Sequence, residues 1–257
     1  MTLDPLALLP EVDRATDRLL RTVDGLDDAA IGEPSLLPGW TRGHVLSHLA
    51  RNADSMVNLL TSARTGRDIP QYPNPAARDA DIAAGAPRPA VDQLADLRAS
   101  AERFAEAART LPAAAWAAEV RTFRGHLPAA VLTWRRLREV EIHHVDLAAG
   151  YRTADWPDAF AQRLLHEVAR DLAHRAEPFA LTLHPTESGQ PLILGDGNGN
   201  EGKSSGGDPD PDGVAGPEPR TVAGPAHELA GWLTGRSAGA GLAVTPAGPL
   251  PAPPPWM

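Results

Sequence analysis

Two short stretches of the chain place metal-capable side chains at helical spacing on otherwise apolar segments. His44 and His48 lie four residues apart in the first stretch, and Glu139 and His143 have the same spacing in the second. Residues four apart on an α-helix differ by about 40° in direction, so each pair shares a face. Two imidazoles and one carboxylate suit a divalent ion that keeps open coordination positions, as catalysis requires. The spacing therefore predicts one metal ion held between two helices.

The second stretch offers a competing pair. Glu141 and His144 lie three residues apart and also share a helical face. The apolar pattern of this segment does not decide which pair turns inward, and any of these side chains could instead be a satisfied interior histidine or part of a solvated face. Zinc is the natural ion for imidazole and carboxylate ligands, with iron, nickel and manganese as alternatives. From the residues alone, both the pair and the metal stay open.

The composition limits the classes of protein to which this chain can belong. The 257 residues are 42% hydrophobic, which is enough to build a core in one large domain or two ordinary ones. The formal net charge of −9 and the lack of a Lys/Arg-rich block argue against a nucleic-acid partner. With no cysteine, the chain has no disulfide and no thiol of its own, so any thiol chemistry must use a small-molecule thiol.

The sequence shows no targeting or membrane segment. Its first ten residues lack a basic region followed by a long apolar stretch, so we expect no signal peptide. No run of 18 apolar residues occurs, so we expect no membrane span. A cytoplasmic protein is the resulting prediction.

Hydrophobic periodicity predicts a helical first part of the chain. Thr41 is the expected N-cap of one helix, Pro128 fits the first turn of another, and Gly150 is expected to end it. The predicted helices cover residues 5–23, 42–63, 76–84, 90–110, 128–149 and 157–176, with a connection at 25–38 and a mixed segment at 112–125.

The composition changes after Pro178. Residues 179–184 alternate like a strand and are expected to pair with 191–194. Short strands at 221–222 and 242–245, a helix at 225–234, and a flexible Gly/Asp/Pro/Ser-rich loop at 196–219 complete the prediction. We therefore expect an α+β protein, with a helical domain over residues 1–176 and a small α/β domain over 177–257.

The motifs that carry this chemistry resemble a known family. Residues 39–54 and 138–147, and more weakly 224–236, are similar to the mycothiol-dependent maleylpyruvate isomerase family, and the resemblance spans nearly the whole chain. It implies a DinB-like four-helix bundle followed by the family's C-terminal domain. The loop at 196–219 looks longer and richer in Gly and Asp than the family pattern, which bears on substrate identity more than on fold.

The resemblance implies a ligand set. The family's zinc ligands are one histidine on the second helix and a Glu-x-x-x-His pair on a later helix, which correspond to His48, Glu139 and His143. The four-residue step of that motif selects Glu139 and His143 over Glu141 and His144. His44 then becomes a cofactor-binding or outer residue of the site, while it stays a possible ligand.

Two arginines complete the implied site, and three further residues near the motifs are expected to have structural roles. Arg78 matches a family arginine that binds the acidic substrate or the thiol, and Arg236 is carried over for the same catalytic and cofactor-binding role, a surface salt bridge being the alternative for each. Trp40 is expected as a core anchor. Asp54 and Asp146 are expected as caps or as partners that fix the tautomer of a ligand histidine.

The implied activity is cis–trans isomerisation of a maleylpyruvate-type substrate. Zinc would hold mycothiol as a thiolate, which adds to the cis double bond; the single bond rotates and elimination returns the thiol. A mycothiol S-transferase acting on an electrophilic xenobiotic or biosynthetic intermediate is the alternative enzyme. A non-catalytic metal-binding or small-molecule-binding protein is the alternative from another class. The expected partners are mycothiol and a small carboxylate-bearing electrophile, without nucleic acid or membrane.

Overall fold

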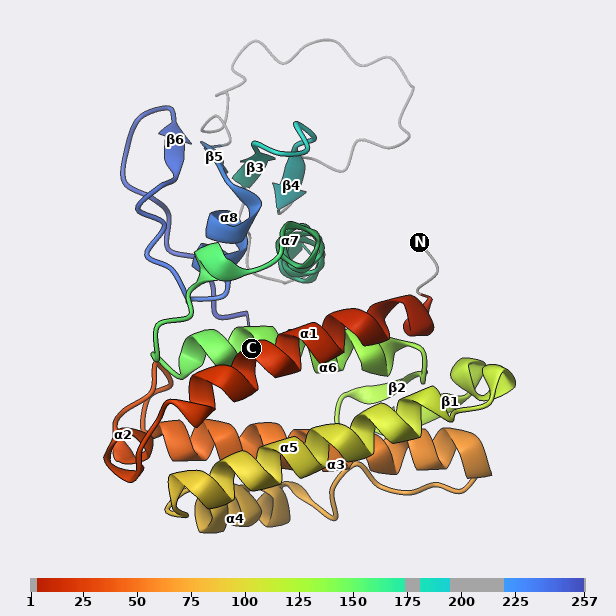
Figure 1. Ribbon diagram of the computed structural model, residues 1–257. Coiled ribbons are helices and arrows are strands. Elements are labelled where there is room, and N and C mark those ends of the chain that lie inside the picture. The colour runs from red at the N-terminus through yellow and green to blue at the C-terminus, as the bar shows by residue number, and fades with distance from the viewer. Residues whose placement is uncertain (1–3, 174–180, 195–219, 257) are drawn as a thin grey trace. The chain divides into compact units, whose positions relative to one another are not determined.

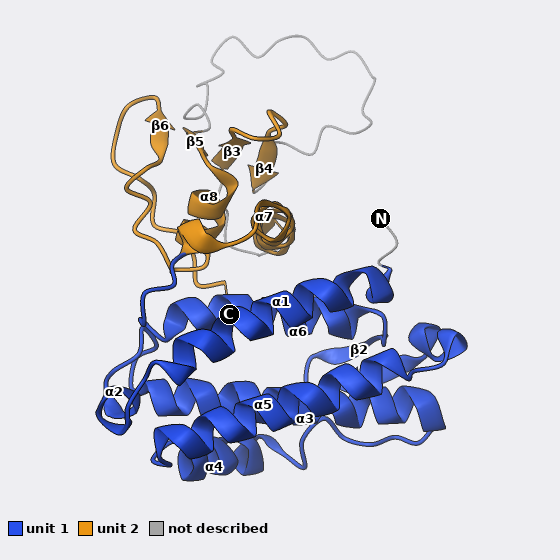
Figure 2. Cartoon of the chain, viewed as in Figure 1, with its two compact units in different colours: residues 1–152 blue, residues 153–257 orange. Residues whose placement is uncertain are grey.

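The computed structural model describes residues 4–173, 181–194 and 220–256, and the chain forms two compact units, residues 1–152 and 153–257 (Figures 1 and 2). The predicted loop at 196–219 lies outside the described residues. Helical and sheet elements together give the predicted α+β fold. Among the described residues, every helix is too short or too polar to cross a membrane.

The first unit is mostly helical. Its elements are, in chain order, α1 (Pro5–Asp24), α2 (Asp28–Gly32), α3 (Arg42–Thr65), α4 (Pro75–Gly85), α5 (Ala90–Arg109), the 3-10 helix η1 (Ala113–Ala117), β1 (Glu119–Thr122), β2 (Gly125–Pro128) and α6 (Val131–Asp146).

Four long helices of this unit form a bundle. α1 packs against α5 and α6, and α3 packs against the same two helices, so each helix has two neighbours (Figure 1). The interior is apolar, with Leu19, Leu49 and Leu132 buried completely. The arrangement makes α3 and α6 adjacent, and these two helices carry the histidines and glutamates singled out by their spacing.

Local sequence sets the ends of α3. The Thr41 side chain accepts a hydrogen bond from the backbone N–H of His44, and the His44 side chain accepts one from the backbone of Thr41. This reciprocal capping box satisfies donors that the first helical turn leaves unpaired. Gly66 ends the helix with φ of 69°, a left-handed conformation that glycine adopts without strain.

Two glycines allow α4 to approach α3 closely. A Cβ atom on Gly43 would lie 2.1 Å from the carbonyl oxygen of Ala86, and one on Gly85 would lie 2.2 Å from the Ser47 hydroxyl. The buried side chain of Gln93, on α5, donates to the carbonyl oxygens of Gly85 and Ala86 at 2.8 and 3.2 Å. These contacts fix α4 against the turn of α3 that precedes His48.

The start of α6 differs from the prediction. Pro128 is the last residue of β2 rather than part of a helix, because β1 and β2 form an antiparallel hairpin within the segment read as mixed. The helix ends at Asp146, before Gly150, and Ala148 takes a left-handed φ of 53°. The predicted connection at 25–38 likewise contains the short helix α2.

The second unit joins helices to a mixed sheet. Its elements are the 3-10 helix η2 (Thr153–Asp155), α7 (Asp158–Ala173), β3 (Leu181–Pro185), β4 (Leu192–Leu194), β5 (Arg220–Gly224), α8 (Ala226–Leu233) and β6 (Ala243–Thr245). The strand order is β4-β3-β5-β6, with β3 and β5 parallel and the outer pairs antiparallel. The predicted pairing of β3 with β4 is confirmed, with Leu181 opposite Leu194.

The division between the units falls earlier than the boundary predicted at residue 176. α7 packs against α8 and β4, so its apolar residues, including Leu164, Leu165 and Val168, help to form the core of the second unit. Amphipathic periodicity predicts the helix but does not say which core its apolar face covers.

Candidate metal centre

Three side chains from two helices converge to form the one group with metal-ligand geometry found among the described residues: His48, Glu139 and His143. The Nε2 atom of His48 lies 3.0 Å from Oε2 of Glu139 and 3.1 Å from Nε2 of His143. The remaining pair, His143 Nε2 and Glu139 Oε2, is 3.4 Å apart. Ligand atoms of a tetrahedral zinc ion lie roughly 3.3 Å from one another, given bonds of about 2.0–2.1 Å. The donor set and its spacing therefore fit a divalent ion.

The cluster is partly accessible. The side chain of His48 is 7% exposed, and those of His143 and Glu139 are 13% and 19% exposed. α3 positions His48, and one turn of α6 positions the other two residues four positions apart. Three protein ligands leave coordination positions open, which is the arrangement of catalytic rather than structural zinc sites.

Asp146 orients one of the candidate ligands. Its Oδ2 atom lies 2.8 Å from Nδ1 of His143 and accepts a hydrogen bond from it. Because Asp146 is almost fully buried, at 1% exposure, this contact holds the imidazole with Nε2 directed at the cluster. A carboxylate on the remote nitrogen of a ligand histidine is a common outer partner of metal sites. The predicted contact of Asp146 with a candidate ligand histidine is present, and its role at a metal site stays a prediction, whereas Asp54 pairs with Arg51 and Arg103 instead.

The protonation of the cluster follows from these contacts. Burial pulls the pKa of His143 down, but hydrogen bonds to Asp146 and Glu139 outweigh it and raise that pKa to about 9. Burial raises the pKa of Glu139, but its hydrogen bonds to the two histidines hold the pKa well below the usual range. Burial lowers the pKa of His48. At neutral pH the group thus pairs an anionic carboxylate with a cationic His143 and a neutral His48.

Arg78 lies beside the cluster. Its Nη2 atom is 3.2 Å from Nδ1 of His48, and its Nη1 atom pairs with Asp79 at 2.7 Å. The guanidinium carbon lies 6.0 Å from the centre of the Tyr72 ring, within the range of a cation–π contact. A guanidinium only donates hydrogen bonds, so Nδ1 of His48 is the acceptor here. Tyr72 was not expected from the sequence, where it stands alone in a proline-rich segment.

His44 lies outside the three-residue cluster. Its Nδ1 atom accepts from the backbone N–H of Thr41 at 3.2 Å, as part of the α3 cap. Its ring stacks on Trp40 with centroids 6.0 Å apart, and the same Trp40 ring meets His48 edge to face at 5.7 Å. His44 thus contacts a neighbour of the cluster, and its cofactor-binding role stays a prediction.

The competing pair on α6 faces a different helix. The Glu141 carboxylate pairs with Arg18 of α1 at 2.5 Å and accepts from the Tyr151 hydroxyl at 2.6 Å. His144 contacts the hydroxyl of Thr22, also on α1, at 2.8 Å, and its ring stacks on Tyr151. This second pair therefore joins α6 to α1 and is not part of the metal-capable cluster.

Arg136 links the two helices that carry the metal-capable cluster. It is 1% exposed, and its Nη1 atom donates to the carbonyl oxygen of Leu49 and to Oδ1 of Asn52, both at 2.9 Å. These acceptors lie in the turn of α3 that follows His48, while Arg136 itself lies one turn before Glu139. Sequence reasoning missed this residue, because nothing in the arginine-rich start of α6 distinguishes a buried arginine from exposed ones.

Arg236 belongs to the second unit. Its backbone N–H donates to the carbonyl oxygen of Gly231 at 2.7 Å, and its Nη1 atom donates to that of Thr234 at 2.7 Å. These contacts place it at the C-terminal end of α8. Its catalytic and cofactor-binding role stays a prediction.

A four-helix bundle with two histidines and one carboxylate converging between two of its helices defines a class: metal-capable helical-bundle proteins with open coordination positions. Two solved structures narrow the class. A crystal structure of a mycothiol-dependent maleylpyruvate isomerase superposes with a TM-score of 0.86 at 29% sequence identity, covering 100% of both chains. A histidine-to-alanine mutant of such an isomerase superposes with a TM-score of 0.85, at the same identity and coverage.

The family model described as the mycothiol maleylpyruvate isomerase N-terminal domain matches residues 12–148, more than half of the chain. The chain therefore belongs to the mycothiol maleylpyruvate isomerase family, a family of enzymes, as its motifs predicted. No curated protein sequence matches the chain. The matched segment contains the whole metal-capable cluster and ends close to the boundary between the two compact units.

Proposed function

We propose that the protein is a zinc-dependent enzyme that uses mycothiol to isomerise a maleylpyruvate-type cis substrate to its trans form. The convergence of His48, Glu139 and His143 between α3 and α6 is the observation on which this proposal rests. The likeness to solved isomerases supports the reaction. The lack of cysteine in the chain supports an external thiol.

His48, Glu139 and His143 would hold the metal, and a zinc ion bound there would act as a Lewis acid that lowers the pKa of a thiol and stabilises its thiolate. Asp146 accepts a hydrogen bond from Nδ1–H of His143 and so directs Nε2 of that ring at the cluster. The carboxylate of Glu139 supplies a negative charge that reduces the net charge of the loaded site. Reversible addition of a thiolate to the cis double bond gives an enolate and permits rotation about the resulting single bond, and elimination of the same thiolate forms the trans double bond.

Arg78 is the proposed anchor for a substrate carboxylate. In the structure it donates to Nδ1 of His48. If His48 held a metal through Nε2, its Nδ1 atom would carry the proton, so Arg78 would lose this acceptor and its Nη2 donors would be available. A planar guanidinium then suits a carboxylate, and a nearby positive charge would stabilise an enolate formed during addition. We assign the same substrate-binding or thiol-binding role to Arg236, and an outer role in thiol binding to His44.

A direct assay tests the proposal. The zinc-loaded protein is incubated with maleylpyruvate and mycothiol, and the products are followed by NMR. We expect the trans isomer, with the mycothiol concentration unchanged at the end of the reaction. His48→Ala should abolish turnover, whereas His144→Ala, which removes the histidine of the competing pair, should retain it.

The alternatives give different results in the same assay. A stable mycothiol conjugate of another electrophile, with no trans product from maleylpyruvate, would identify an S-transferase instead. Metal binding without any binding of mycothiol to the loaded protein would leave only a metal-binding function and contradict both enzyme proposals.

A further inference from the structure

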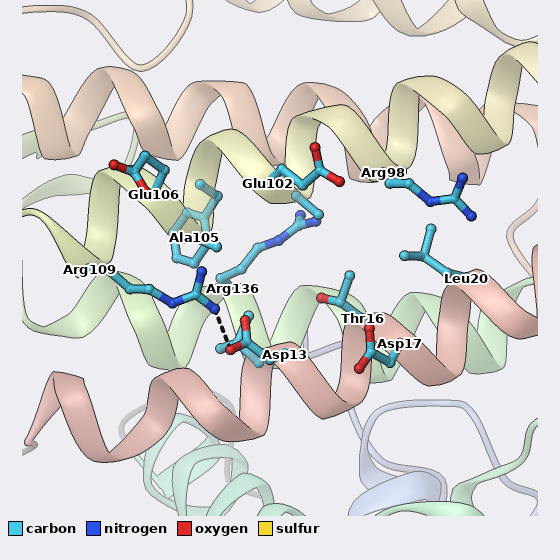
Figure 3. Close-up of a pocket in the computed structure, with 13 residues that line it drawn as sticks. Asp13, Thr16, Asp17, Leu20, Arg98, Glu102, Ala105, Glu106, Arg109 and Arg136 are labelled. Carbon is cyan, nitrogen blue, oxygen red and sulfur yellow. Dashed lines mark hydrogen bonds and ion pairs between the residues drawn. The ribbon is translucent and has the colours of Figure 1, made fainter.

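A cavity of about 640 Å³ lies between α1 and α5, formed by helices of the first unit and lined at its floor by Arg136 of α6 (Figure 3). Figure 3 shows the Arg136 side chain between the ribbons of these two helices, with Glu102 and Asp17 on either side. None of the three metal-capable residues lines the cavity. It is therefore a feature separate from the proposed reaction.

Arg136 is a buried cation without an anionic partner. Both acceptors of its Nη1 atom are uncharged, and its buried Nη2 atom has no hydrogen-bond partner. Within residues 4–173, 181–194 and 220–256, no carboxylate forms an ion pair with it. Burial lowers its pKa to about 10, so the guanidinium still carries its charge at neutral pH. Buried charges are normally paired, because an unpaired one costs several kcal/mol of desolvation.

The rest of the lining is apolar along the wall of the cavity and acidic at its rim. Apolar side chains of Val12, Leu20 and Phe104 form part of the wall, and the carboxylates of Asp17 and Glu102 stand at the rim. Neither of these two carboxylates forms an ion pair with another described residue.

Other charges at the rim are partly matched. Asp13 is already paired with Arg109 at 2.6 Å, while Glu106 and Arg98 contribute one further charge of each sign. The cavity therefore offers a cationic floor, an apolar wall and a rim with unpaired acidic groups.

We propose that this cavity binds a small zwitterion, whose carboxylate pairs with Arg136 and whose ammonium group faces Asp17 and Glu102. The carboxylate supplies the anion that the buried guanidinium lacks, and a guanidinium–carboxylate pair is among the stronger hydrogen-bonded contacts in proteins. A molecule with only an anionic group would be repelled by the carboxylates at the rim. A molecule with only a cationic group would be repelled by Arg136. An apolar body between the two charges matches Val12, Leu20 and Phe104.

Titration calorimetry of the full chain tests the proposal with three probes of one shape. L-leucine carries both charges, isocaproate lacks the ammonium group, and isopentylamine lacks the carboxylate. We expect L-leucine to bind saturably and each analogue to bind about tenfold or more weakly, as the loss of one charged hydrogen-bonded contact implies. Absence of saturable L-leucine binding, or equal affinity for isocaproate, would overturn the proposal.

Substitutions in the lining test whether L-leucine binds in this cavity. Ala105 lines the cavity on α5, so Ala105→Trp should fill it without altering Arg136 and should weaken L-leucine binding about tenfold or more. Ala107→Trp, at a half-buried position of the same helix outside the lining, is the matched control and should bind like the wild type. Unchanged affinity in Ala105→Trp would place the binding elsewhere. Arg136→Met should also lose binding, and circular dichroism would show whether that variant folds.

Discussion

Helix α6 carries two Glu/His pairs that look alike in the sequence and differ in the structure. Glu139 and His143 face α3, where they meet His48 and form the metal-capable cluster. Glu141 and His144 face α1, where Arg18 and Thr22 provide their partners. Both pairs are largely shielded from solvent, and both place a carboxylate and an imidazole on one side of the helix.

The two pairs differ in the groups that compensate the negative charge of each carboxylate. Glu141 pairs with a guanidinium and accepts from the Tyr151 hydroxyl, so its charge is compensated by the protein itself. Glu139 is instead surrounded by the two imidazoles of His48 and His143, which can exchange a proton for a metal ion. A Glu/His pair is thus metal-capable when imidazoles, rather than an arginine, complete its surroundings.

Removal of a candidate ligand should produce the largest difference in zinc affinity between the two pairs. His143→Ala removes one of three candidate ligands, and we expect zinc affinity to fall by more than about 100-fold, beyond the effect typical of an outer partner. His144→Ala removes the histidine of the other pair and should leave zinc affinity within about threefold of the wild type. Competition with a chromogenic chelator measures both variants. Equal losses in the two variants would mean that the cluster is not the metal site.

The metal-capable pair should also make the stability of the metal-free protein depend on pH. The folded-state pKa of His143 is about 9, raised above its unfolded value of about 6.5. Its contribution to the stability of the metal-free protein is therefore complete below pH 6.5 and is lost as the pH rises through about 9. We expect a decrease of at most about 3 kcal/mol over this window, measured by urea unfolding in a chelator. His143→Gln should remove that slope; a slope that persists would assign it to another group.

The structural pair should affect stability without affecting metal binding. Arg18→Met removes a guanidinium that pairs with the buried Glu141 carboxylate. Because Arg18 is 28% exposed, we expect a loss of about 2 kcal/mol in the free energy of unfolding, below the range for a fully buried pair. Zinc affinity should not change. A loss of zinc affinity in folded Arg18→Met would show that the two faces of α6 are coupled.

The residues of the metal-capable cluster could be predicted from the sequence because helical spacing survives folding. His48, Glu139 and His143 share faces by their four-residue steps, and the family motif selected them among the alternatives. The choice between Glu139/His143 and Glu141/His144 could not be made from the periodicity of α6, because both faces of this helix are buried, one against α3 and one against α1.

Other features required the tertiary structure. The two strands of the β1–β2 hairpin have four residues each, too few for alternation to stand out, and because β2 includes Pro128, α6 begins after that residue. The burial of Arg136 depends on acceptors more than 80 residues away in the chain, on α3. Its position therefore has no local sequence signal, unlike the capping box of Thr41 and His44, which is local and could be read in part from the sequence.

The smallest expected effect concerns an outer partner of the cluster. Asp146→Asn keeps a hydrogen-bond acceptor beside Nδ1 of His143 but removes its charge, so the imidazole stays oriented while it becomes a weaker ligand. We expect zinc affinity to fall about tenfold, the lower end of the range for outer partners. Asp54→Asn is the matched control, because Asp54 pairs with Arg51 and Arg103 rather than with a residue of the cluster, and it should bind zinc like the wild type. If Asp146→Asn also binds zinc normally, the carboxylate orients His143 without tuning it, and the advantage of this pair over Glu141 and His144 rests on ligand convergence alone.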